Sequence, residues 1–231
     1  MSQIFELRQY TLHPGQRDVL IELFDREFVE SQEDLGIEVV GQFRDLDRPD
    51  RFVWVRGFAS MEARKTALSA FYGGPVWAAH QDVANPTMID FDDVRLLRPA
   101  SAGGGFPPMS RTDAGARAAD TALTTATIYS FAEPVTEAVL ELFDRVVEPL
   151  LTRSGSDRSA LLRTEPSPNT YRALPVREGE HVVVRFGRQA DEHTHAAADS
   201  ARQAATASLT PYLLSAPIEL RLEPTLRSLL R

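Results

Sequence analysis

Hydrophobic and polar residues alternate along residues 4–12, IFELRQYTL, and this period of two predicts a β-strand. Glu6, Arg8 and Tyr10 fall on one face of that strand. The dipeptide Pro14-Gly15 then predicts a turn. Between residues 17 and 31 the apolar positions recur every three or four residues, which predicts an amphipathic helix. The first predicted elements are therefore a strand, a turn and a helix.

The same two periods continue through the first half of the chain. Ser60 fits the N-cap of a helix, and Gly73-Gly74-Pro75 ends that helix. The resulting order of strand, helix, strand, strand, helix, strand is typical of a ferredoxin-like domain, in which helices cover one face of an antiparallel sheet. The further strands are predicted at 37–44, 51–58 and 89–97, and the further helices at 60–71 and 77–83.

The second half repeats this order. Strands are predicted at 127–131, 160–164, 181–186 and 218–222, and helices at 135–151 and 191–209. The pentapeptide ELFDR occurs at 22–26 and again at 141–145, an offset of 119, and Tyr10 meets Tyr129 at that same offset.

Two further matches keep the order of the repeat. VWVR at 53–56 meets VVVR at 182–185, an offset of 129, and Pro99 meets Pro224 at 125. The extra residues fall in the Pro-rich segment 165–180, where a loop tolerates an insertion. Collinear matches of this kind indicate one structural unit used twice.

A Gly- and Pro-rich stretch at 99–108, followed by a polar, Ala-rich stretch to residue 122, predicts a flexible linker. The predicted domains are therefore 1–99 and 123–231, with the linker at 100–122. The fold class is α+β.

Composition narrows the possible partners. The formal net charge of -8 disfavours nucleic acid, which needs a surplus of Lys and Arg on one face. The absence of cysteine excludes disulfides and thiolate metal sites. No apolar run approaches the length of a membrane helix, and residues 1–10 lack the features of a signal peptide. We therefore expect a cytoplasmic protein with no membrane partner and no metal site. A homodimer is neither required nor forbidden by the sequence.

Three segments of the first half resemble the NIPSNAP family: ELRQYTLHPG, GIEVVGQFRDLDRPDRFVWVRGF and GGPVWAAHQ. The resemblance covers residues 4–99. The second half lacks the corresponding turn and the Gly-Pro-x-Trp segment, so it looks like a diverged second copy of the domain.

The resemblance implies the dimeric α+β barrel superfamily, in which two ferredoxin-like sheets face each other and carry their helices outside. Two tandem domains would build such a barrel within one chain. The superfamily includes cofactor-free monooxygenases, decarboxylases, cyclases, isomerases and haem enzymes, together with proteins of no known reaction. The fold therefore does not choose a reaction.

If the helices cover one face of each sheet, the other face lines the barrel, and we expect the polar set of residues there. Val53 and Val55 are then expected to face the helices. Arginines on the interior face could hold a carboxylate, enolate or phenolate, and the aromatic residues could stack on a flat ligand. The alternative is that these arginines form structural ion pairs with Glu6, Glu38 and Glu165. The candidate ligand-binding residues are Arg8, Gln42, Arg44, Trp54, Trp77, Tyr129, Arg163 and Arg185, and the candidate catalytic residues are His80, Tyr10 and Arg56.

His80 follows Trp77 by three positions, so the two share a helix face. An imidazole titrates near neutral pH, which makes His80 the candidate general acid or base. The resemblance also allows it as an axial haem ligand, although the expectation is that no cofactor is needed. The alternative is a histidine that caps the end of its helix.

Two classes of function remain open. The first is an enzyme that binds an aromatic or polyketide-like anionic metabolite in the barrel and catalyses a cofactor-free oxygenation, cyclisation or isomerisation. The second is a non-catalytic binding or scaffold protein of the NIPSNAP type with a packed barrel, or a haem-binding barrel protein. A barrel interior filled with large apolar side chains would contradict the first as stated.

Overall fold

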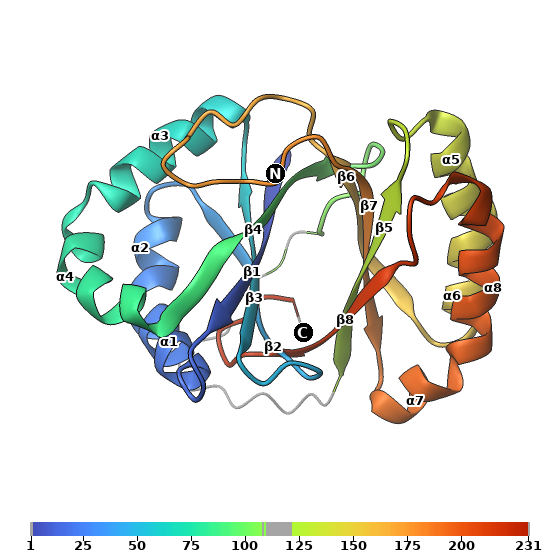
Figure 1. Cartoon of the computed structure of the whole chain (residues 1–231), viewed down its shortest axis with the longest axis horizontal. Helices are drawn as coiled ribbons and strands as arrows, with labels where there is room; N and C mark the ends of the chain where they lie inside the picture. Colours follow the sequence, from blue (N-terminus) through green and yellow to red (C-terminus); the bar gives the residue numbers. More distant parts are fainter. Residues whose placement is uncertain (1, 108, 110–121, 231) are drawn as a thin grey trace.

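In the computed structural model, which describes residues 2–107, 109 and 122–230, eight strands form one closed antiparallel barrel in the order β1-β3-β2-β8-β5-β7-β6-β4. Two groups of helices cover opposite outer sides of it (Figure 1). Most of the predicted linker, residues 108 and 110–121, lies outside the described residues. The strands are β1 (Ile4–Leu12), β2 (Glu38–Asp45), β3 (Arg51–Phe58), β4 (Met88–Pro99), β5 (Leu123–Phe131), β6 (Asp157–Thr164), β7 (His181–Gln189) and β8 (Ile218–Pro224).

Each half has one group of helices, and both groups contain a π-helical turn directly after the first helix. The first group is α1 (Arg17–Leu23), the π turn η1 (Phe24–Phe28), α2 (Val29–Glu33), α3 (Met61–Tyr72), α4 (Pro75–Ala84) and the short η2 (Asn85–Thr87). The second group is α5 (Glu137–Leu142), the π turn η3 (Phe143–Val147), α6 (Glu148–Arg153), α7 (Glu192–Ala197), α8 (Asp199–Leu209) and the short η4 (Thr210–Tyr212).

The strand order confirms two tandem ferredoxin-like units in one chain. The first half forms the sheet β4-β1-β3-β2 and the second half forms β6-β7-β5-β8. The sheets join where β2 pairs with β8, as at Phe43 and Pro224, and where β4 pairs with β6, as at Leu97 and Thr164. Closure gives every strand two neighbours, so no sheet edge is left open for aggregation.

Two irregular features recur at the offset of ELFDR. The π turns begin at Phe24 and Phe143, 119 residues apart. The β-bulges of the second strands lie between Val39 and Gly41 and between Arg158 and Ala160, again 119 apart. The β-bulges lie at positions where the letters of the two halves differ, so their recurrence in the same register supports the repeat independently of the pentapeptide.

The predicted alignment of VWVR with VVVR is wrong by two residues. In the first half, Arg56 lies opposite Glu6. In the second half, Thr125 is the equivalent of Glu6 at the offset of 119, and it lies opposite Gly187. The structural offset in these strands is therefore 131, and Arg185 takes the place of Trp54. An alternating strand looks similar after a shift of two, and an even shift leaves every side chain on its original face.

The barrel interior is packed with apolar side chains from both sheets, so the expected ligand site inside it is wrong. Val53 and Val55 point into the barrel rather than toward the helices. Phe106, from the segment after β4, places its ring 5.4 Å from Phe5 and 5.0 Å from Phe186. Leu230, the last residue that the structure describes, also packs there.

The physical reason is closure. A face sealed between two sheets has no water and no helix to supply polar partners, so the apolar set must occupy it. The charged and aromatic set faces the helices instead, where other side chains can pair with it. Within the described residues, no helix is both long enough and apolar enough to cross a membrane.

Candidate functional site

A cluster of four charged side chains is buried between the first sheet and its helices. Glu6 and Arg8 come from β1, Arg56 from β3 and Arg64 from α3, and each side chain is 0% exposed. The Glu6 carboxylate accepts hydrogen bonds from Arg8 Nη1 at 2.6 Å, Arg56 Nε at 2.7 Å and Arg64 Nε at 2.6 Å. One carboxylate therefore faces three guanidinium groups.

The cluster carries two more positive charges than negative ones. Burial alone would raise the pKa of Glu6, but Arg56, Arg8 and Arg64 outweigh it and hold that pKa well below its usual range. The Nη2 atoms of all three arginines are buried and have no hydrogen-bond partner among the described residues. Water could satisfy those hydrogen bonds but not the excess charge, so the cluster has the properties of an anion site.

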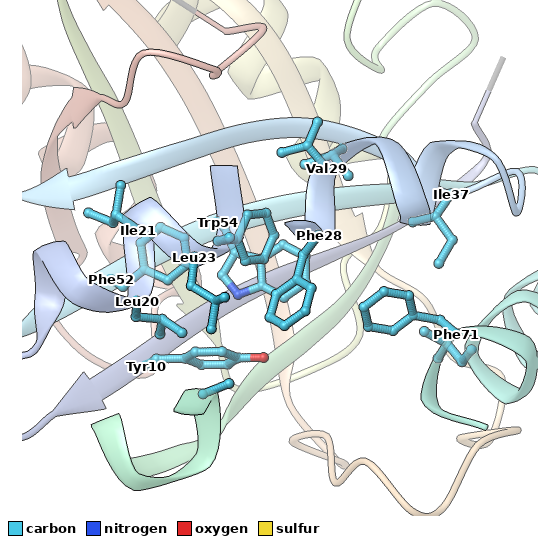
Figure 2. Packing of buried hydrophobic residues seen from close by; sticks show 14 of the residues in the cluster. Tyr10, Leu20, Ile21, Leu23, Phe28, Val29, Ile37, Phe52, Trp54 and Phe71 are labelled. Carbon is cyan, nitrogen blue, oxygen red and sulfur yellow. The ribbon is translucent and has the colours of Figure 1, made fainter. Parts of the chain in front are cut away.

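Beside the cluster lies a small aromatic cavity of about 40 Å³. Figure 2 shows Tyr10, Trp54 and Phe28 within the apolar cluster that surrounds it. Arg8 lies over the Tyr10 and Trp54 rings at 5.4 and 5.6 Å, and Arg56 lies over Trp54 at 4.9 Å. The lining residues are Tyr10, Leu20, Phe24, Phe28, Gln32, Trp54, Phe71, Tyr72, Trp77, Ala84 and Met88.

Two lining residues connect the cavity to the charges. The Tyr10 hydroxyl accepts a hydrogen bond from Arg8 Nε at 2.8 Å, and Gln32 Oε1 accepts one from Arg56 Nη1 at 3.2 Å. Burial raises the pKa of Tyr10, so its hydroxyl stays protonated at neutral pH. The Tyr10 proton is therefore available for donation to a ligand oxygen.

A loop from the second half closes this site. Residues 165–180, between β6 and β7, cross toward α3 (Figure 1) and are called the strap below. Asn169 Oδ1 accepts a hydrogen bond from Arg64 Nη1 at 3.0 Å, and Thr170 donates to the carbonyl of Met61 at 3.1 Å. Tyr171 stacks on Tyr72 with ring centroids 6.2 Å apart. The insertion recognised in the sequence thus completes the site of the other half.

Asn169→Ala is expected to loosen the strap without unfolding the barrel. Asn169 bonds to Arg64, to the Tyr171 amide and to the Leu174 carbonyl, and losing such bonds costs about 1–2 kcal/mol locally. Hydrogen exchange at the Tyr171 amide should therefore accelerate by roughly 5–30-fold.

The control for this variant is Ser167→Ala, because the Ser167 side chain is exposed in the same loop. Its exchange at Tyr171 should match the wild type, as should exchange at Val55 in the barrel for both variants. Acceleration of less than about twofold in Asn169→Ala would show that Asn169 does not hold the strap.

The structure brings together five of the predicted site residues. Arg8, Tyr10, Trp54 and Arg56 meet at the cluster, and Trp77 lines the cavity. The predicted ion pairs with Glu6 also form, so the structural alternative holds for part of this set.

The other predicted residues lie elsewhere. Arg44 pairs with Asp18 at the surface, and the side-chain amide of Gln42 is buried without a partner among the described residues. Arg163, 21% exposed, pairs with the exposed carboxylate of Glu137. Tyr129 and Arg185 belong to a separate cleft in the second half.

His80 lies outside the cavity. Its Nε2 is 3.4 Å from the Glu27 carboxylate, the side chain is 28% exposed, and its ring lies 6.2 Å from the Phe28 ring. The adjoining cavity has a volume of about 40 Å³, and His80 is not among its lining residues. Within the described ranges, no group of three His, Asp or Glu residues is placed to hold a metal ion.

Sequence reasoning missed Arg64, Gln32 and Asn169. Arg64 follows Ala63 in the polar first turns of α3, a position that the helical pattern assigns to solvent. Asn169 lies in a loop that the sequence places in the other half. Glu6 could have indicated the cluster, because this carboxylate lies beside Arg8 on a strand face that also carries Tyr10.

Comparisons with known proteins agree with this architecture. Residues 5–102 match the model of the NIPSNAP family. A candidate monooxygenase from Fusobacterium nucleatum subsp. nucleatum shares 8% identity and a TM-score of 0.61, over 96% of this chain and 92% of that one. An anthrone oxidase-like protein shares 16% identity and a TM-score of 0.60, over 97% and 92%.

A second candidate monooxygenase, from Lactobacillus acidophilus, shares 13% identity and a TM-score of 0.55, over 97% of this chain and 94% of that one. At these identities the likeness shows a common fold, the complete α+β barrel, and not a common reaction. No curated protein sequence matches the chain significantly.

Proposed function

We propose that the protein binds a small aromatic or polyketide-like anion between the first sheet and its helices. Residues 5–102 match the model of the NIPSNAP family, and the two halves of the chain close one α+β barrel. The observation that carries the proposal is the buried cluster of three guanidinium groups on one carboxylate, with three unpaired Nη2 atoms. Buried charges are normally paired, and a bound anion would pair these.

The ligand's charged group is proposed to lie against Arg8, Arg56 and Arg64. Charge-assisted hydrogen bonds from guanidinium groups are strong, and a site without water strengthens them further. The ligand's ring system would contact Tyr10 and Trp54, which already stack with the arginines. The mixture of cation and aromatic ring suits a flat anion better than an aliphatic one.

Access to this site requires movement. A cavity of about 40 Å³ holds little more than one water molecule, whose share of liquid volume is about 30 Å³. Tyr72 and Trp77 line the cavity and are only partly buried, and the strap lies over Tyr72. We propose that these two side chains and the strap move outward when the ligand enters.

For an enolisable or phenolic ligand, the same groups support catalysis. The guanidinium groups favour the enolate or phenolate, and the Tyr10 hydroxyl can donate a hydrogen bond to its oxygen. We propose that such an anion reacts by oxygenation, cyclisation or isomerisation and that no cofactor is needed to form it. A second candidate is binding without turnover, because the unpaired guanidinium nitrogens would hold an anion whether or not it reacts.

The test is calorimetric titration of the full chain with salicylate and with its neutral analogue salicyl alcohol. Salicylate is expected to bind at least about tenfold more tightly, a difference of about 1.4 kcal/mol, because only the carboxylate offsets the buried charge. Equal affinity for the two probes, or binding of neither, would contradict the proposal. Analysis of the bound compound after incubation in air, by mass spectrometry, separates turnover from binding.

A further inference from the structure

We propose that the second half holds a separate site, for a neutral polyhydroxylated ligand such as a sugar or polyol, in the cleft between β5, β7, β8 and α8. The cleft has a volume of about 460 Å³, within the range of small-molecule pockets. It occupies the position in the second half that the aromatic cavity occupies in the first. This proposal does not depend on the anion site.

Replacements between the two halves explain why this cleft is open. In the register of the strands, Thr125 and Thr127 stand where the first half has Glu6 and Arg8, and Gly187 stands in place of Arg56. A side chain on Gly187 would place its Cβ 2.4 Å from Arg185 Nη1, so glycine is needed for Arg185 to lie where it does.

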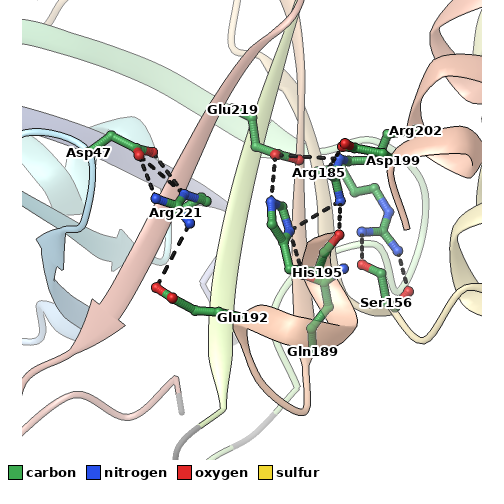
Figure 3. Close-up of polar contacts among 10 residues, drawn as sticks. All are labelled: Asp47, Ser156, Arg185, Gln189, Glu192, His195, Asp199, Arg202, Glu219 and Arg221. Carbon is green, nitrogen blue, oxygen red and sulfur yellow. Dashed lines mark hydrogen bonds and ion pairs between the residues drawn. The ribbon is translucent and has the colours of Figure 1, made fainter. Parts of the chain in front are cut away.

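The charged groups around the cleft are already paired. Arg185 donates to both Glu148 oxygens, at 3.0 and 3.1 Å, and to the Ser156 carbonyl at 2.8 Å. Arg202 donates to the His195 carbonyl at 2.6 Å and lies 3.6 Å from Glu219 (Figure 3).

The balance of charge is slightly negative. Three arginines, Arg158, Arg185 and Arg202, face four carboxylates, those of Asp144, Glu148, Asp199 and Glu219. The cleft therefore lacks the surplus of positive charge found in the first half, and an anion would gain nothing by entering it.

The cleft contains hydroxyl groups that have no hydrogen-bond partner among the described residues. Thr125, Thr127 and Tyr129 lie at alternate positions of β5 and line the cleft. Among the described residues none of the three side-chain hydroxyls has a hydrogen-bond partner, and they follow one another in steps of roughly 7 Å along the strand. Burial raises the pKa of Tyr129 to about 12, so its hydroxyl remains a donor at neutral pH.

A ligand that satisfies this row must offer several hydrogen-bonding groups along its length and no net negative charge. Gln203 and Thr206 from α8 add an amide and a hydroxyl on the facing wall. Sugars and polyols present hydroxyls at such intervals, and their donors and acceptors match groups that can do both. Those properties set the chemical class that we propose.

The test measures binding of D-glucose, myo-inositol and D-glucuronate to the full chain by saturation-transfer NMR titration. Glucose or inositol is expected to bind, and glucuronate at least about fivefold more weakly than glucose, as a loss of about 1 kcal/mol implies. Thr127→Val should weaken binding about 5–10-fold through loss of one hydrogen bond. Thr124→Val, whose side chain alternates to the barrel face of the same strand, should not.

A second variant, Ala207→Trp, fills the exposed wall of the cleft and should abolish binding while the circular dichroism spectrum stays unchanged. Arg64→Met in the first half should leave sugar binding intact, which separates this site from the anion site. Binding of neither neutral probe, tighter binding of glucuronate, or unchanged affinity in both Thr127→Val and Ala207→Trp would overturn the proposal.

Discussion

Glu6→Gln is expected to lower the free energy of unfolding by about 3–5 kcal/mol at pH 7, because removing one partner of a buried ionic cluster leaves the others uncompensated. Three buried guanidinium groups would then share no negative charge at all. Denaturant titration measures the difference. The control is Glu22→Gln on the exposed face of α1, which should change stability by less than about 0.5 kcal/mol.

The same variant has a predicted pH dependence. The pKa of Glu6 lies well below its unperturbed value of 4.5 in the folded protein, so the folded state keeps this carboxylate ionised where the unfolded state binds a proton. The stabilisation contributed by the Glu6 carboxylate is complete above pH 4.5 and is lost as the pH falls below this unperturbed pKa toward the folded-state pKa. The wild-type protein should therefore lose more stability than Glu6→Gln between about pH 5 and pH 3. Equal losses would show that Glu6 is not the depressed carboxylate.

Arg64→Met is expected to separate stability from ligand binding. In buffers of weakly binding anions the variant should unfold within about 1 kcal/mol of the wild type, or be more stable, because the substitution removes excess buried charge and keeps the side chain's volume. Its affinity for salicylate should fall about 10–100-fold, since a hydrogen bond to a charged group contributes about 1.5–3 kcal/mol.

The matched control is Arg26→Met in the π turn η1, where the Arg26 side chain is 64% exposed. It should change neither quantity. If Arg64→Met instead loses about 3–5 kcal/mol of stability and keeps its response to salicylate, the cluster is a structural ion-pair network and the anion site is refuted.

Much of the fold could be predicted because local pattern and global packing agree. The alternation in IFELRQYTL and the helical period after it correspond to β1 and to α1 through α2. The repeat was visible in ELFDR because both copies end one α-helix and enter a π turn at the same letter, Phe24 and Phe143.

The orientation of the sheets could not be predicted from the same pattern. Alternation correctly separates Glu6 and Tyr10 from Val53 and Val55, but it does not say which set meets the helices. The usual assumption that helices cover the apolar face fails here, because closure of the barrel seals the other face even more completely. A charged set is tolerated only where Arg64 and Gln32 can come from helices to meet it.

Contacts that join the two halves also could not be predicted from the sequence. The strap has no period of its own, and nothing in its composition shows that Asn169 meets Arg64 across 105 positions of the chain. The cleft of the second half is visible only after strand register places Gly187 opposite Thr125. Both features depend on three-dimensional register rather than on local pattern.

A buried anion site in the first half can be tested directly by crystallography. Crystals would be grown in bromide, and diffraction would be recorded at the bromine absorption edge. The aromatic cavity of about 40 Å³ lies beside the cluster and is not lined by its arginines, and it is large enough for a halide without movement of the strap. An anomalous peak is expected within hydrogen-bond distance of the unpaired Nη2 atoms of Arg8, Arg56 and Arg64, and it should be absent from Arg64→Met. A cluster without a peak, with those nitrogens paired to protein oxygens, would contradict the anion site.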